Sequence, residues 1–372
     1  MDQTPRRFAW SPATARALDG AGYQALLAAQ AVWVVAHLGL LAAGWVIAAT
    51  QIGSALAAPA LAVTRRLGPK RALYLGTALA ALTRIALLFA TLTSPLLLVV
   101  IATCAMSATS WLPDLATKQD VLVRSRSPRT LGTLLLVVTI AHALGSAAPT
   151  ALADPTFTAA FTITALLAAA SLVPTLFLVR PHTQPTPTTT ASSSQRLPRN
   201  YLTAVALLAF AVTGPTAVWA SLCTQIVGQT WVALLGLLYI LSAALALVPA
   251  KLHFDPTGTR LLSILAGASG AMWLVHAGAL WFLATMVVSC VWVIAVTGVI
   301  LASAGHRAGT AGMAQVTTVI SLATAASALL TPLIYNATGQ VGIALIMTVP
   351  AAVSAFACPA LLRPNPHLHT AE

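Results

Sequence analysis

Apolar residues form a series of long runs along the chain, separated by short polar connections. Many runs approach 20 residues, the length that an α-helix needs to cross the hydrocarbon core of a bilayer. A membrane barrel would instead show alternating segments of about 10 residues. We therefore expect an all-α polytopic membrane protein with twelve transmembrane helices. The predicted spans are 13–38, 41–64, 72–92, 95–115, 131–152, 157–179, 201–223, 231–249, 261–277, 280–304, 310–335 and 341–362.

A polar segment at 180–200, rich in Thr, Ser and Pro, divides these spans into two sets of six. Its composition is typical of a flexible, solvated tether. The pattern predicts an N-terminal six-helix bundle at 1–179, a cytoplasmic linker at 180–200, a second bundle at 201–362 and a cytoplasmic tail at 363–372. Two related six-helix halves are a known architecture of secondary transporters.

Composition and charge support a membrane protein. Apolar residues make up 58% of the chain and charged residues only 7%, whereas soluble domains carry roughly 25% charge. The net charge of +12 does not indicate nucleic-acid binding, because the cations lie in short loops between apolar runs. With a cytoplasmic N-terminus, every Lys and Arg except Arg84 falls on the cytoplasmic side, as the positive-inside rule requires. We expect both termini in the cytoplasm and the protein in the inner (plasma) membrane.

No enzyme motif stands out along the chain. The four cysteines are isolated in separate apolar runs, and neither they nor the histidines have the spacing of a metal site. A nucleotide-binding P-loop is absent from the sequence, so ATP hydrolysis is not expected to drive transport. We expect no cofactor, no metal and no catalytic residues.

The loop after span two and its counterpart after span eight carry a family pattern. In the major facilitator superfamily the first loop reads G-x-L-a-D-R-x-G-R-K-R, and this sequence resembles that motif in both halves. The matching residues are Arg66, Gly68, Lys70 and Arg71 in the first loop and Asp255, Gly258 and Arg260 in the second. Arg65 stands where the family has an Asp, and the antiporter motif of span five survives only as Ala148-Pro149.

The resemblance implies a monomeric secondary transporter that works by alternating access. The stretch 111–115 is similar to the end of span four in many exporters of the family. The leading interpretation is proton-coupled efflux of a small lipophilic or amphipathic molecule, with membrane lipid and protons as further partners. An importer or uniporter of a small solute is one alternative. A non-transporting membrane receptor or assembly partner with the same fold is another.

Two charged residues within spans are candidates for substrate or proton binding, because ionisable groups are costly in hydrocarbon. Arg84 lies roughly 18 Å into span three, near the midplane. It could contact an anionic substrate or a protonating acid, or bond structurally to hydroxyls such as those of Thr103 or Ser107. Asp19 could carry a proton in a low-dielectric cavity, or pair with Arg16 in the headgroup zone.

Further candidates are neutral or titrate near neutral pH. His142 in span five could shuttle protons, or it could be a packed histidine with a hydrogen bond. Polar and aromatic residues decorate the spans that the family uses to line its cavity, and such a lining suits a lipophilic ligand with a few polar anchors. The remaining substrate candidates are Gln24, Gln30, Ser107, Trp111 and Trp219.

The motif loops form the predicted cytoplasmic gate. In the first loop Arg65, Arg66, Lys70 and Arg71 lie close together without a carboxylate of their own, and like charges at this spacing repel. The topology places Asp114 at the same end of span four. We therefore predict that Asp114 pairs with Arg66 or Arg71.

Overall fold

The computed structural model describes residues 5–93, 95–125, 196–214, 218–228, 252–275 and 278–362, with isolated positions between 141 and 170 and between 234 and 246. The described residues are helical apart from short turns. The chain divides into two compact units. One consists of Met1–Ser193 and Val218–Leu241, and the other of Ser194–Ala217 and Ser242–Glu372.

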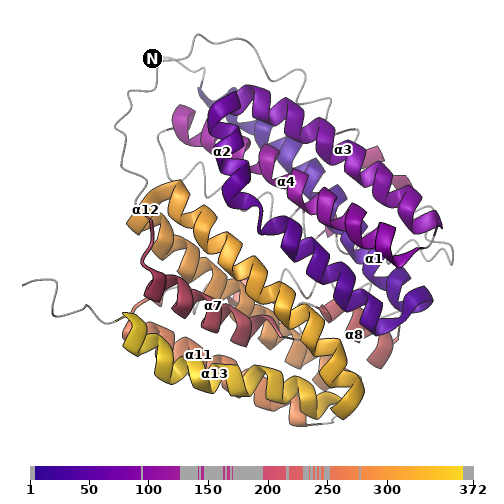
Figure 1. The fold of residues 1–372 in the computed structure, drawn as a ribbon, viewed down its shortest axis with the longest axis vertical. Coiled ribbons are helices and arrows are strands. Elements are labelled where there is room, and N and C mark those ends of the chain that lie inside the picture. Colours follow the sequence, from indigo (N-terminus) through magenta and orange to yellow (C-terminus); the bar gives the residue numbers. More distant parts are fainter. Residues whose placement is uncertain are drawn as a thin grey trace, which may run out of the picture. The chain divides into compact units, whose positions relative to one another are not determined.

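The first unit contains α1 (Pro5–Ser54), α2 (Ala57–Leu67), α3 (Pro69–Thr93), α4 (Leu96–Ser125) and α8 (Trp219–Ile226). Helix α4 packs against both α1 and α3, as Figure 1 shows. Helix α8 packs on α1, which is why its segment groups with this unit although it follows the linker in sequence.

Gly39 divides the long helix α1 into two spans. Its backbone has φ of 83° and ψ of 173°, a conformation that glycine adopts far more easily than other residues because it lacks a Cβ. This position lies between the predicted spans 13–38 and 41–64. Tyr23 and Ser54, on either side of it, both form a hydrogen bond with Ser107, so the chain turns back between them. The second span then continues from the end of α1 through α2.

The second unit contains α7 (Arg199–Thr213), α11 (Pro256–Ala271), a 3-10 turn (Met272–Leu274), α12 (Ala279–Thr338) and α13 (Gln340–Leu362). Helix α7 packs against α12 and α13, and α11 packs along α13 (Figure 1). Helix α12 folds back on itself, because a Cβ placed on Gly312 would lie 2.6 Å from the carbonyl oxygen of Ala304. A straight helix would separate these residues by roughly 12 Å.

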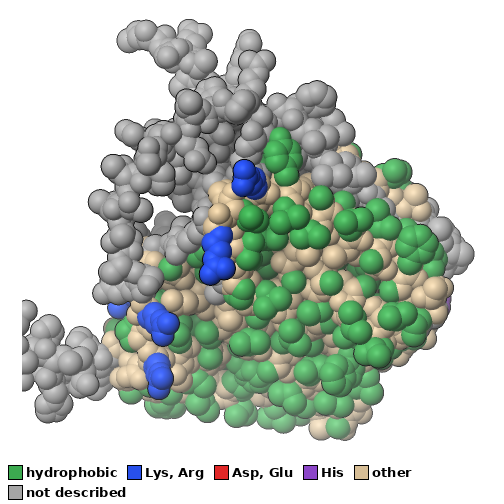
Figure 2. All heavy atoms as spheres, turned by 45° about the horizontal axis from the view of Figure 1, so that its top comes forward, with side chains coloured by type: hydrophobic (Ala, Val, Ile, Leu, Met, Phe, Trp, Pro, Cys, Tyr) green, Lys and Arg blue, Asp and Glu red, His purple; other side chains and the backbone are tan. Residues whose placement is uncertain are grey.

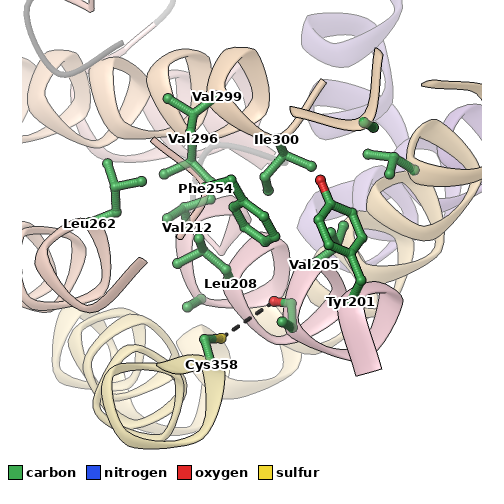
Figure 3. Packing of buried hydrophobic residues seen from close by; sticks show 14 of the residues in the cluster. Tyr201, Val205, Leu208, Val212, Phe254, Leu262, Val296, Val299, Ile300 and Cys358 are labelled. Carbon is green, nitrogen blue, oxygen red and sulfur yellow. Dashed lines mark hydrogen bonds between the residues drawn. The ribbon is translucent and has the colours of Figure 1, made fainter. Parts of the chain in front are cut away.

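The core of the second unit is apolar and closely packed. Leu208 and Val212 of α7 meet Phe254 from the loop before α11, and Val296 and Ile300 of α12 face them (Figure 3). Cys358 of α13 donates a hydrogen bond to the Ala204 carbonyl oxygen at 3.5 Å.

Six helices in the described part of the chain are long and apolar enough to cross a membrane. One of them, Ala17–Thr64, is 48 residues long and covers two predicted spans. Large apolar side chains project outward, including Phe89 at 62% and Phe356 at 76% exposure. Figure 2 shows apolar side chains over much of the visible surface, with Lys and Arg side chains near its margin. This distribution fits a surface in contact with lipid.

The structure changes the boundaries of two predicted spans, and three other spans lie mostly outside the described residues. Predicted span nine began at residue 261, but α11 begins at Pro256 because Asp255 caps it and Pro256 suits a first helical position. Within predicted span seven, α7 ends at Thr213 and α8 begins at Trp219, and residues 215–217 lie outside the described residues. Most of spans five, six and eight lies outside the described residues.

Candidate functional site

A buried ion pair joins two helices of the first unit. The Arg84 Nη2 of α3 donates to the Asp19 Oδ1 of α1 at 2.5 Å, and the exposed fractions of the two side chains are 1% and 7%. The structure thus brings together the two charged candidates from within spans. The alternative hydroxyl partners for Arg84 are engaged elsewhere, because Thr103 accepts from Gln30 and Ser107 accepts from Tyr23.

The guanidinium group of Arg84 is only partly satisfied. Its Nε and Nη1 atoms are buried and have no hydrogen-bond partner among the described residues. An unpaired buried donor costs about 1–3 kcal/mol, and more when it is charged. The pair is therefore a polar centre with spare donor capacity inside an apolar unit.

Tyr23 links this pair to α4. Its ring lies 5.7 Å from the guanidinium carbon of Arg84, within the range of a cation–π contact. Its hydroxyl donates to the Ser107 Oγ at 3.3 Å, and Ser107 also shares a hydrogen bond of 2.8 Å with Ser54. The candidate Ser107 therefore belongs to the same polar network as Asp19 and Arg84.

A second polar contact lies further along the same face of α1. The Gln30 Nε2 donates to the Thr103 Oγ1 at 2.7 Å, and Thr103 itself donates to the Val99 carbonyl of its own helix. The Gln30 Oε1 is buried without a partner in the described part of the chain. Gln30 is thus a second residue of α1 with an unused hydrogen-bonding atom.

Helical periodicity explains why α1 supplies these groups together. Asp19 and Tyr23 are one turn apart, and Gln30 lies about two further turns along the same face. Small residues allow the neighbouring helices to approach. A Cβ on Gly53 would collide with the Cys104 carbonyl oxygen and lie 2.8 Å from the Ser107 Cβ. Glycine at this position therefore lets the second span reach α4 beside the network.

Other predicted lining residues contribute less to this network. Gln24, Trp111 and Trp219 are half-buried, and the Nε1 of Trp219 is buried without a partner among the described residues. His142 lies outside the described residues. Sequence reasoning missed Tyr23 and Ser54, although the spacing of Tyr23 one turn after Asp19 was an available signal.

The first gate loop turns sharply at Gly68, whose φ is 78°. Arg66 and Arg71 are exposed, and Asp114 is half-buried; the side chains of Arg65 and Lys70 lie outside the described set. Asp114 has an interaction partner in the structure. The predicted pairing stays a prediction about the closed gate.

The two helices that carry these gate groups do lie against one another. A Cβ on Gly76 of α3 would lie 2.5 Å from the Pro113 Cδ and 2.6 Å from the Leu112 Cβ of α4. Glycine at position 76 therefore allows α3 to contact α4 closely at Pro113, the residue before Asp114. Because α3 and α4 pack together here, Asp114 lies within about two turns of Arg71 along the helix pair.

In the second gate loop, the structure explains why Asp255 and Gly258 occupy their positions. The Asp255 Oδ1 accepts from the Gly258 backbone N–H at 2.6 Å and caps the start of α11. A Cβ on Gly258 would collide with the carbonyl oxygen of His253, so this position has no room for a side chain. Arg260, the fifth residue of the helix, is exposed.

Comparison with known proteins identifies the family of the chain. The family model described as Major Facilitator Superfamily matches residues 13–332. No curated protein sequence matches the chain. The fold is similar to the crystal structure of nucleoside transporter NupG, at 12% identity and a TM-score of 0.72, over 96% of this chain and 100% of that one.

A second solved structure has the same fold. The crystal structure of peptide transporter POT in complex with sulfate is 14% identical, with a TM-score of 0.67, over 96% of this chain and 94% of that one. At such low identity these likenesses concern the fold alone.

Proposed function

The chain belongs to the major facilitator superfamily, and on that premise we propose that it exports a small lipophilic or amphipathic molecule in exchange for protons. It is a multi-pass membrane protein and a secondary transporter, not an enzyme. We place it in the inner membrane with both termini in the cytoplasm. The halves at 1–179 and 201–362 would alternate access around the linker.

The observation that carries the proton-coupling part of the proposal is the buried pair between Asp19 and Arg84. While Asp19 is ionised the pair has no net charge. A proton on Asp19 leaves the Arg84 cation buried without its counter-ion, which is costly in a medium of low dielectric constant. Protonation therefore changes the net charge of this centre from zero to +1.

This change in charge makes protons and certain substrates compete. A cationic lipophilic molecule is tolerated by a neutral centre and repelled by one that carries +1. Such a substrate would bind when Asp19 is ionised and leave when Asp19 is protonated. Competition between substrate and proton for one carrier is the requirement for antiport. In this scheme Asp19 carries the proton and Arg84 is its counter-ion.

A second candidate follows from the unused donors of Arg84. Its Nε and Nη1 could bind a carboxylate or another anion. An anion at Arg84 would favour a proton on Asp19, because the two together keep the centre neutral. Anion and proton would then travel in the same direction, which corresponds to an importer driven by the proton gradient.

A two-stage experiment tests the proposal. Thermal-shift screening of the purified protein against a library of lipophilic amines, neutral molecules and organic acids would identify a ligand. Proteoliposomes loaded with that ligand and with the pH dye pyranine would then be diluted into ligand-free buffer. Antiport predicts that the lumen acidifies as the ligand leaves, whereas symport predicts that it becomes more alkaline. No pH change in either direction would contradict proton coupling.

A further inference from the structure

Exposed arginines gather around the start of α7 in the second unit. Arg196 and Arg199 lie on either side of the turn that begins this helix, and both are exposed. The guanidinium carbon of Arg307, from the turn within α12, lies 5.2 Å from the centre of the Tyr201 ring. Arg307 thus lies beside the start of α7, the segment that carries Arg196 and Arg199.

This arrangement is held in place by contacts among three segments. The Tyr201 ring meets the Phe254 ring edge-on at 5.0 Å (Figure 3). The Leu197 backbone N–H donates to the Gln315 Oε1 at 3.1 Å. The start of α7, the loop before α11 and the first turns after the α12 reversal are therefore fastened together. We call Arg196, Arg199 and Arg307 the arginine cluster.

The arginine cluster lacks internal counter-charge. The whole chain has 19 Lys and Arg but only 7 Asp and Glu. Within the described part of the second unit Asp255 is the only acidic residue, and its Oδ1 caps α11. None of the three arginines forms an ion pair with a carboxylate among the described residues. No described carboxylate of the second unit therefore neutralises the arginine cluster.

The N-terminus of α7 adds to this positive potential. No side chain caps that helix, and its first turn contains no acidic residue. The free amides at a helix start carry partial positive charge. Arg199 lies in that first turn, where a cation is unfavourable unless an anion is nearby. This local arrangement favours a bound anion over an empty site.

Apolar surface lies close to these cations. Phe254, which touches Tyr201, directly precedes the cap of α11, and Arg260 is the fifth residue of that helix. The side chains that follow, Leu261 and Ile264, are 42% and 52% exposed. A ligand with an anionic head and apolar chains would therefore satisfy the cations and cover the neighbouring helix surface together.

We propose that the arginine cluster binds the phosphodiester headgroup of an anionic glycerophospholipid from the surrounding leaflet, with its acyl chains along α11. The planar guanidinium groups donate paired hydrogen bonds to phosphate oxygens. Basic pockets beside transmembrane helices are suited to such headgroups. Arg307 is already oriented by Tyr201, so less conformational entropy is lost when the lipid binds. This site is independent of the transport reaction.

Native mass spectrometry of the full-length protein tests this site. Detergent-solubilised wild type would be titrated with dioleoyl phosphatidylglycerol and, separately, with dioleoyl phosphatidylcholine. The Arg196→Gln, Arg199→Gln, Arg307→Gln triple variant should retain at least tenfold less phosphatidylglycerol, since each arginine near an anionic lipid contributes about fivefold. Phosphatidylcholine binding should be unchanged, and thermal unfolding would establish that the variant is folded.

A matched control variant distinguishes specific lipid binding at the arginine cluster from general attraction of anionic lipid to any cytoplasmic arginines. Arg124→Gln, at the end of α4, together with Arg126→Gln and Arg129→Gln beyond it, removes the same charge elsewhere in the chain. If the proposal is right, this variant binds phosphatidylglycerol like wild type within about twofold. Equal loss of lipid in both triple variants, or none in either, would overturn it. Displacement of the lipid by inorganic phosphate at equal concentration would also overturn it, because the site would then recognise a free anion.

Discussion

Removing the carboxylate of Asp19 should destabilise the protein more than almost any other single polar change. In Asp19→Asn the Arg84 guanidinium, 1% exposed, would lose its counter-ion while two of its nitrogen atoms already lack partners. Breaking a buried pair by removal of one partner costs about 3–5 kcal/mol. For a unit of roughly 200 residues, 3 kcal/mol corresponds to a fall of about 6–12 °C in melting temperature.

Thermal unfolding followed by tryptophan fluorescence in detergent would measure this effect. The matched control is Asp255→Asn, because Asp255 is exposed and an asparagine can still cap α11. We expect its melting temperature to stay within about 2 °C of wild type. A similar small change in Asp19→Asn would show that the pair contributes little to folding.

A double variant separates the structural role of the pair from its role in transport. Replacing both partners by apolar residues, as in Asp19→Leu with Arg84→Met, removes the uncompensated charge and is often neutral or stabilising by about 1–4 kcal/mol. We therefore expect the double variant to melt near or above wild type but to lose proton-coupled transport. Proton-coupled transport at the wild-type rate in this variant would refute the coupling role.

Three further predictions concern the gate and the topology. Gly258→Ala should lower stability by about 1–3 kcal/mol, because the added methyl group collides with backbone, and thermal unfolding would detect the loss. Asp114→Ala should lower transport, and the charge-swapped Asp114→Arg with Arg71→Asp should partly restore it; a double-mutant cycle without coupling energy would exclude the pairing. Reporter fusions at Pro185 should read cytoplasmic and at Gln229 exterior, and one inverted result would remove the twelve-span topology.

The helical membrane fold could be predicted because its signals are local. Apolar runs of membrane length mark helices, and Gly39 was found between two such runs where the chain reverses. The end of α7 at Thr213, inside predicted span seven, was less visible, because the apolar run 201–223 continues beyond it. The start of α11 was missed by five residues, since the polar cap at Asp255 extends the helix beyond its apolar run.

The candidate site could be predicted only as separate residues. Asp19 and Arg84 stood out because charge is rare in apolar runs, but their pairing depends on how α1 and α3 pack in space. No local pattern in the sequence encodes that contact. Tyr23 was missed because a tyrosine in an apolar run usually packs or anchors at an interface, and its contacts with Arg84 and Ser107 appear only in three dimensions.

Proton movement through Asp19 tests the central claim most directly. Pyranine-loaded proteoliposomes containing a ligand from the thermal-shift screen would be diluted into ligand-free buffer, with protein-free liposomes as the control. We predict that the lumen acidifies with wild type, and that Asp19→Asn releases the ligand with no acidification above the control. Equal acidification by both proteins would contradict the account, and an alkaline shift with wild type would replace export by antiport with symport.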